Sequence, residues 1–133
     1  MTVVVDTSAV LAVLLGEPDA SRYADALSRN IGDLHMSAVS LVETRIVLES
    51  RKGPDAAADL ETLIARVSIR VEAVTADQAD RAWGAWRRFG KGCHPARLNL
   101  GDCFSYALVR ALRGNLLYKG DDFSQTDVPA LLG

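Results

Sequence analysis

The fold is decided by the stretch Thr2-Val3-Val4-Val5-Asp6-Thr7-Ser8. Its three consecutive valines predict a short buried strand, because β-branched side chains suit a strand that is covered on both faces. The apolar run Ala9 to Leu15 predicts a helix directly afterwards, so Asp6 lies where a strand ends and a helix begins. In open α/β sheets this end of a strand borders the ligand crevice. Asp6 therefore either caps the helix or belongs to a site, with the hydroxyl and N–H groups of Thr7 and Ser8 beside it.

Strands and helices alternate along the rest of the chain. Helices are predicted over residues 18–29, 37–52, 55–67, 75–89 and 99–113, and strands near 34–36, 68–74 and 116–118, with a last edge strand around Val128. Helical spacing of apolar residues, N-cap residues and Gly or Pro breakers carry these assignments. Leu60, Leu63 and Ile64 are expected to face inward. This alternation predicts an α/β sandwich with a mostly parallel sheet.

The composition is that of one ordinary globular domain. The chain has 133 residues, of which 49% are hydrophobic and 24% charged, so a single domain over residues 1–133 can bury a real core. No apolar run is long enough to span a membrane, and we expect a cytoplasmic protein. Cys93 and Cys103 are too few for a disulfide framework and lack a zinc-ligand spacing.

The charge distribution says more than the net charge of −2. No acidic residue occurs from Arg81 through Gly101, whereas basic residues recur there. Trp83, Trp86 and Phe89 are interleaved with them, and cations mixed with aromatic rings are typical of surfaces that hold single-stranded nucleic acid. Because the three rings recur at helical spacing, at least one is expected in the core. The candidates for phosphate contact are Arg87, Arg88, Lys91, Arg97 and Lys119.

Several acidic residues occupy positions similar to that of Asp6. Glu43 lies near the start of an apolar helix, Asp102 lies in the first turn of another, and Asp121 and Asp122 follow a strand. Asp102 could simply complement its helix dipole, and Glu43 could face solvent. If the four regions converge, an all-oxygen carboxylate set would suit Mg²⁺ or Mn²⁺, which would relieve the repulsion between the acids. Such an ion assists attack of water on a phosphodiester.

Four segments of this chain resemble PIN-domain ribonucleases, and among them the VapC toxins of bacterial toxin–antitoxin pairs. They are Val3-Val4-Val5-Asp6-Thr7-Ser8-Ala9, Ser40-Leu41-Val42-Glu43, Leu98-Asn99-Leu100-Gly101-Asp102-Cys103-Phe104-Ser105-Tyr106-Ala107 and Leu116-Leu117-Tyr118-Lys119-Gly120-Asp121-Asp122-Phe123. The resemblance implies a PIN-like three-layer sandwich with helices on both faces of a twisted parallel sheet. It also implies cleavage of single-stranded RNA, commonly tRNA or ribosomal RNA.

The same resemblance implies roles for the acidic residues. Asp6 and Asp102 would be the principal ligands of Mg²⁺ or Mn²⁺, and Glu43 would be a ligand or would orient the attacking water. The fourth acid would be Asp121, with Asp122 close behind. Thr7 or Ser8 would hydrogen-bond a ligand carboxylate or the phosphate.

The resemblance further implies a VapB-like antitoxin and a homodimer. The apolar residues Val10, Leu11, Val13, Leu14 and Leu15 would help to form an antitoxin groove or a dimer contact, although a deep core helix explains them equally well. Two other functions remain open. A receiver-type phosphoacceptor switch also uses an acidic Mg²⁺ pocket, but it usually has paired acids after its first strand. A non-catalytic module that binds RNA or an antitoxin would not need every proposed acid.

Overall fold

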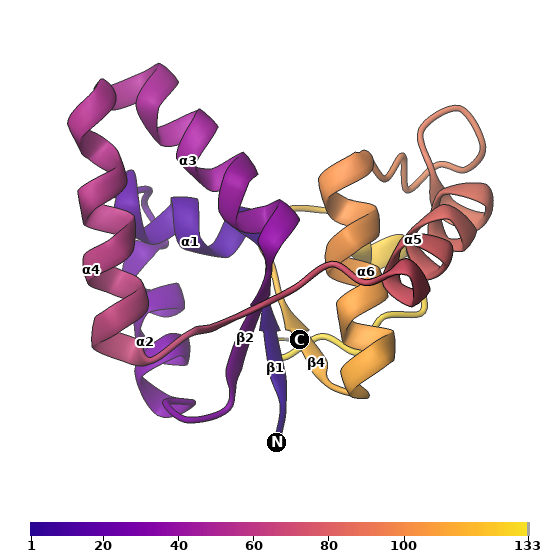
Figure 1. The fold of residues 1–133 in the computed structure, drawn as a ribbon, viewed down its shortest axis with the longest axis horizontal. Coiled ribbons are helices and arrows are strands. Elements are labelled where there is room, and N and C mark those ends of the chain that lie inside the picture. Colours follow the sequence, from indigo (N-terminus) through magenta and orange to yellow (C-terminus); the bar gives the residue numbers. More distant parts are fainter. Residues whose placement is uncertain (133) are drawn as a thin grey trace.

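Four parallel strands form the centre of the computed structural model, which describes residues 1–132 (Figure 1). They are β1 (Val3–Val5), β2 (Leu34–Ser37), β3 (Arg70–Glu72) and β4 (Asn115–Leu117), in the order β3-β2-β1-β4. Each neighbouring pair is parallel, as predicted. The carboxyl ends of all four strands therefore meet at one edge of the sheet, where the chain continues into the segments that carry Asp6, Glu43 and the Asp121–Asp122 pair.

Helices cover both faces of this sheet, which confirms the three-layer sandwich (Figure 1). On one face lie α1 (Thr7–Leu14), α2 (Ala20–Arg29), α3 (Ala38–Lys52) and α4 (Ala57–Val67), and on the other lie α5 (Ala76–Phe89) and α6 (Leu100–Leu112). Short 3₁₀ turns occur at Pro54–Ala56 and Phe123–Gln125. Within residues 1–132, none of the helices combines the length and the apolar character needed to cross a bilayer.

The valines of β1 divide the core between the two faces. Val3 and Val5 pack with Leu34, Leu117 and the first four helices, whereas Val4 packs with Leu116 and the residues of α5 and α6. All three valines are completely buried, as the sequence predicted. β1 is covered on both sides, and Asp6 follows it directly. The Asp6 side chain is therefore largely shielded from water as well.

Two peripheral strand predictions were only partly right. The strand predicted over residues 68–74 is limited to Arg70–Glu72, and Val71 is exposed although its alternation with Ile69 and Ala73 suggested burial. β3 is an edge strand, so one side lacks a neighbour that would extend and cover it. As far as residue 132, where the description ends, the tail forms no strand around Val128 and contributes one bridge, between Ala130 and Leu116.

The exposed apolar surface lies elsewhere than the sequence suggested. In α1, Val10 is buried and Leu11, Val13 and Leu14 pack against the core. These residues therefore belong to a core helix, which was the alternative to a groove or dimer contact. In α3, by contrast, the inward face carries the buried Ser40, Thr44 and Leu48. Val42 and Ile46, which recur at helical spacing, are more than half exposed at 53% and 60%. An apolar stripe here marks a surface rather than the core.

Candidate active site

Asp6 is buried at the end of β1 and has a hydrogen-bond donor on each carboxylate oxygen. It caps α1 by accepting a bond from the Ser8 N–H at 3.0 Å, and the Ser8 hydroxyl donates to the same oxygen, Oδ2, at 2.6 Å. The other oxygen, Oδ1, accepts from the Ser105 hydroxyl of α6 at 2.6 Å. The capping role and the site role considered from the sequence are therefore combined in one side chain, and these donors compensate the loss of its hydration.

Glu43 lies on α3 with its carboxylate against the first turn of α6. A Cβ atom added at Gly101 would come within 2.6 Å of both carboxylate oxygens of Glu43, so a larger residue at position 101 would displace this carboxylate. Burial raises the pKa of Glu43, and the charge of Asp6 raises it further, against a lowering by the Thr7 hydroxyl. Glu43 is thus turned toward Asp6 and α6, and is not a solvated residue on the outer face of its helix.

Asp102 lies in the first turn of α6 and forms a reciprocal capping box with Asn99. The Asn99 side chain accepts from the Asp102 N–H at 2.9 Å, and Asp102 Oδ2 accepts from the Asn99 N–H at 3.1 Å. Burial raises the pKa of Asp102 to about 7, with the negative charges of Asp6, Asp122 and Glu43 adding to the shift and the Asn99 backbone opposing it. A carboxylate that served only as a cap would not face three other acids.

The two aspartates after β4, Asp121 and Asp122, have different neighbours. Asp122 lies close enough to Asp102 for its charge to raise the pKa of that residue. Asp121 instead lines a polar hollow with Arg22, Tyr23 and Lys119, and its carbonyl accepts a bond from Ser124. The sequence favoured Asp121 as the fourth acid, with Asp122 close behind. Of the two, Asp122 is the aspartate whose charge acts on Asp102.

The chemistry of this set fits a hard divalent cation. All of the facing groups are carboxylates, which are ligands preferred by Mg²⁺ and Mn²⁺, and a cation would remove the mutual repulsion that Asp102 experiences. As the side chains stand in residues 1–132, no three His, Cys, Asp or Glu residues are close enough together to enclose an ion. Asp6, Glu43, Asp102 and Asp122 are the residues that could supply oxygen ligands to an ion, and of these Asp6 is held in place by its hydrogen bonds to Ser8 and Ser105.

The sequence reasoning missed two buried serines. Ser105 donates to Asp6, and Ser40 lies 3.2 Å from the Ser105 oxygen. Both are completely buried. A signal was present in the sequence, since Ser105 follows Asp102 by three positions and Ser40 precedes Glu43 by three, which places each serine on the same helix face as an acid.

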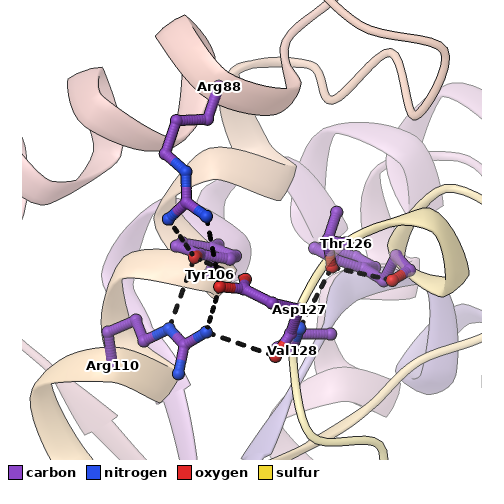
Figure 2. A network of polar contacts seen from close by, with 7 residues as sticks. Arg88, Tyr106, Arg110, Thr126, Asp127 and Val128 are labelled. Carbon is purple, nitrogen blue, oxygen red and sulfur yellow. Dashed lines mark hydrogen bonds and ion pairs between the residues drawn. The ribbon is translucent and has the colours of Figure 1, made fainter.

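The basic candidates separate into paired and outward-facing side chains. Arg88 and Arg110 bond Asp127 and the Tyr106 hydroxyl, a network that holds the tail against α5 and α6 (Figure 2). Lys119 donates to Glu17 and Asp19 at 3.0 and 2.8 Å. Arg87 lies over the ring of the exposed Trp83, and Lys91 and Arg97 are exposed in the loop that follows.

An apolar groove runs past Glu43. Two hollows of about 530 and 650 Å³ meet at Asn99 and Leu100. One is bounded by Trp83 and Trp86 of α5, which are 61% and 44% exposed, and the other by residues of α3 that include Val42, Glu43 and Ile46. Phe89 is the ring of the predicted aromatic trio that enters the core. Since Glu43 lines the α3 part of the groove, anything bound there lies next to this carboxylate.

The fold and the acidic edge of the sheet agree with a family comparison. The PIN domain family matches residues 3–129 of this chain. The chain therefore belongs to the PIN-domain family.

Its relatives within that family are VapC ribonucleases. A "Ribonuclease VapC" of Mycolicibacterium smegmatis is 48% identical over 128 residues, which cover 96% of this chain and 98% of that protein. Among solved structures, Mycobacterium tuberculosis VapC20, a sarcin–ricin loop cleaving toxin, matches with a TM-score of 0.80, 26% identity and 96% coverage of both chains. A DNA-bound VapBC from Salmonella typhimurium matches with a TM-score of 0.77 at 14% identity, covering 98% of this chain and 96% of that chain, and shows the shared fold alone. The chain is thus a VapC-type ribonuclease toxin of a toxin–antitoxin system, and the receiver alternative does not agree with this family.

Proposed function

We propose that this protein is a Mg²⁺- or Mn²⁺-dependent endoribonuclease that cleaves single-stranded regions of tRNA or ribosomal RNA in the cytoplasm. The observation that carries the proposal is that acids from separate parts of the chain face one another at the carboxyl edge of the sheet. Burial raises the pKa of Asp102, and the negative charges of Asp6, Asp122 and Glu43 raise it further. The cost of this repulsion is explained if the pocket normally holds a cation.

The acids have two tasks in this proposal, holding the ion and orienting the attacking water. Asp6, Asp102 and Glu43 would hold the ion, with Asp122 as the fourth acid in preference to Asp121. When bound, a divalent cation polarises a phosphoryl oxygen and lowers the pKa of water. Glu43 supplies a ligand oxygen or orients the attacking water, and it is less restrained than Asp6, which accepts bonds from Ser8 and Ser105. The hydrogen bonds that Ser8 donates to Asp6 support Ser8, of the pair Thr7 and Ser8, as the residue that orients this ligand carboxylate.

RNA approaches along the side of α5 and the loop that follows it. Arg87, Lys91 and Arg97 are exposed and lie in the acid-free segment, so they can contact phosphates. Arg88 and Lys119 already bond acidic residues of the protein, and their contribution to RNA binding is expected to be smaller. The exposed rings of Trp83 and Trp86 offer faces on which bases can stack.

A VapB-like antitoxin would inhibit the enzyme by occupying the apolar groove. The groove is lined by Trp86, Leu100 and Ile46, and Glu43 lies in its wall, so an amphipathic segment bound there would cover Glu43. We further propose that the chain forms a homodimer, as its resemblance to the VapC toxins implies.

The test is cleavage of a mixed RNA pool by the purified chain, freed of any partner. We expect cleavage with Mg²⁺ or Mn²⁺, none after EDTA, and recovery when the metal is restored. Asp6→Asn should be inactive under all conditions, with Asp25→Asn, an exposed residue of α2, as the matched control. Cleavage that persists unchanged in EDTA would refute the metal mechanism, and a correctly folded wild type without any cleavage would favour the non-catalytic binding module.

A further inference from the structure

Two buried serines connect Asp6 to the helices that carry the other acids. Ser105 lies one turn after Asp102 on α6, and Ser40 lies one turn before Glu43 on α3. A serine inside a helix usually bonds a carbonyl of its own preceding turn. The Ser105 hydroxyl instead donates to Asp6, 99 positions away, at 2.6 Å.

The direction of the hydrogen bonds follows from counting protons. A hydroxyl has one proton, and Asp6 as a carboxylate can only accept, so the Ser105 proton is committed to Asp6 Oδ1. The Ser40 hydroxyl, 3.2 Å from the Ser105 oxygen, must then donate to it. This gives a directed chain from Ser40 to Ser105 to Asp6.

A second directed chain reaches the other oxygen of Asp6. The Ser8 hydroxyl donates to Asp6 Oδ2, and its oxygen accepts from the backbone N–H of Lys119 at 2.9 Å. Lys119 follows β4 and precedes Asp121 and Asp122. The elements bearing the proposed metal-binding acids are therefore each bonded to Asp6 through a serine hydroxyl.

We infer that Ser105 is a positioning residue for the metal site, acting through Asp6, and that Ser40 acts in turn through Ser105. This inference rests on the proposed function. By fixing Oδ1 from α6, the Ser105 hydroxyl sets the orientation of the Asp6 carboxylate relative to Asp102, which lies on the same helix. Groups that orient a metal ligand in this way typically contribute about 10- to 100-fold to metal affinity or activity.

The experiment is a titration of Mn²⁺ into wild-type protein, Ser105→Ala, Ser40→Ala and the double variant, by calorimetry without RNA. We expect the Mn²⁺ dissociation constant to rise about tenfold in Ser105→Ala and less in Ser40→Ala. The double variant should bind as weakly as Ser105→Ala and no weaker, because Ser40 acts through Ser105. Ser105→Cys, which keeps a weaker donor of similar size, should fall between Ser105→Ala and wild type.

Val109→Ala is the matched control for a purely structural effect. Val109 is buried in the same helix and belongs to the core on the α5 side, so its truncation should lower the melting temperature without changing Mn²⁺ affinity. Mn²⁺ affinity in Ser105→Ala equal to that of wild type would overturn the inference, as would fully additive effects of the two serine variants. Those results differ from failure of the proposed function, in which the wild type itself would not bind Mn²⁺.

Discussion

Two polar clusters, that of Asp127 with Tyr106, Arg88 and Arg110 and that of Asp102 with the neighbouring acids, compensate a carboxylate in opposite ways. Asp127 accepts the Tyr106 hydroxyl at 2.7 Å and pairs with Arg88 and Arg110, so its pKa is lowered even though burial acts to raise it (Figure 2). Asp102 faces other acids and its pKa is raised to about 7, chiefly by burial. In the first cluster the protein's own Arg88 and Arg110 neutralise Asp127 and hold the tail in place. The second lacks that neutralisation within the described residues, which is the condition of a site that takes a cation from solution.

The largest expected effect separates the two clusters by activity. Asp102→Asn should reduce RNA cleavage about a thousandfold, because loss of a metal ligand removes several kcal/mol of transition-state stabilisation. The matched Asp127→Asn should retain cleavage within about twofold, since the partners of Asp127 within residues 1–132 are Tyr106, Arg88 and Arg110, away from the acidic site. The measurement is single-turnover cleavage of a defined RNA. Equal losses in the two variants would mean that the clusters do not differ in function.

The next effect distinguishes the two clusters by how the free energy of unfolding depends on pH, measured in the absence of divalent cations. The folded state raises the pKa of Asp102 from 3.8 to about 7, so protonation favours folding below pH 4 and this stabilisation is lost as the pH rises through 7. Asp102→Asn does not titrate. Its free energy of unfolding, relative to wild type, should therefore increase by on the order of 2 kcal/mol between pH 5 and pH 8.

Urea unfolding at the two pH values measures this difference. Added Mg²⁺ should reduce it at pH 8 by stabilising the wild-type carboxylate. If the difference in unfolding free energy between Asp102→Asn and wild type stayed constant with pH, folding would not raise the pKa of Asp102. Asp127→Asn provides the contrast, since it should lose only about 1 kcal/mol through its broken surface ion pairs.

The smallest effect concerns the outward-facing cations near the pocket. Arg87→Ala and Lys91→Ala should each raise KM for RNA a few-fold with little change in kcat. The slope of log affinity against log salt should fall by about 0.7 for each phosphate that the variant no longer binds. Arg29→Ala, on the exposed surface of α2, is the matched control and should change neither quantity. An unchanged salt slope in the Arg87 and Lys91 variants would place the RNA elsewhere.

Local sequence patterns predicted the positions of the acids, because each acid lies near the end of a strand or the start of a helix that the sequence marks. The Val3–Val5 run indicated a buried strand ending at Asp6, and Asn99 with Asp102 marked the start of α6. Parallel strands then bring such boundaries to one edge. The mostly parallel sheet and both helical layers followed from the same alternation of strands and helices.

What the sequence did not predict depends on contacts between distant residues. Helical spacing identifies α3 as a helix, but only packing shows that Ser40 and Thr44 face inward while Val42 and Ile46 remain exposed. The hydrogen bond from Ser105 to Asp6 joins residues 99 positions apart, so the sequence places Ser105 on the helix face of Asp102 but does not show that it reaches Asp6. The choice between Asp121 and Asp122 likewise depends on how the loop turns after β4.

The most direct measurement is anomalous diffraction from crystals of this protein soaked in Mn²⁺. We expect a peak bounded by Asp6, Glu43 and Asp102, with Asp122 nearby, and no peak at Asp127. A peak found only elsewhere on the protein, or none at millimolar Mn²⁺, would contradict the proposal that these carboxylates form a metal site.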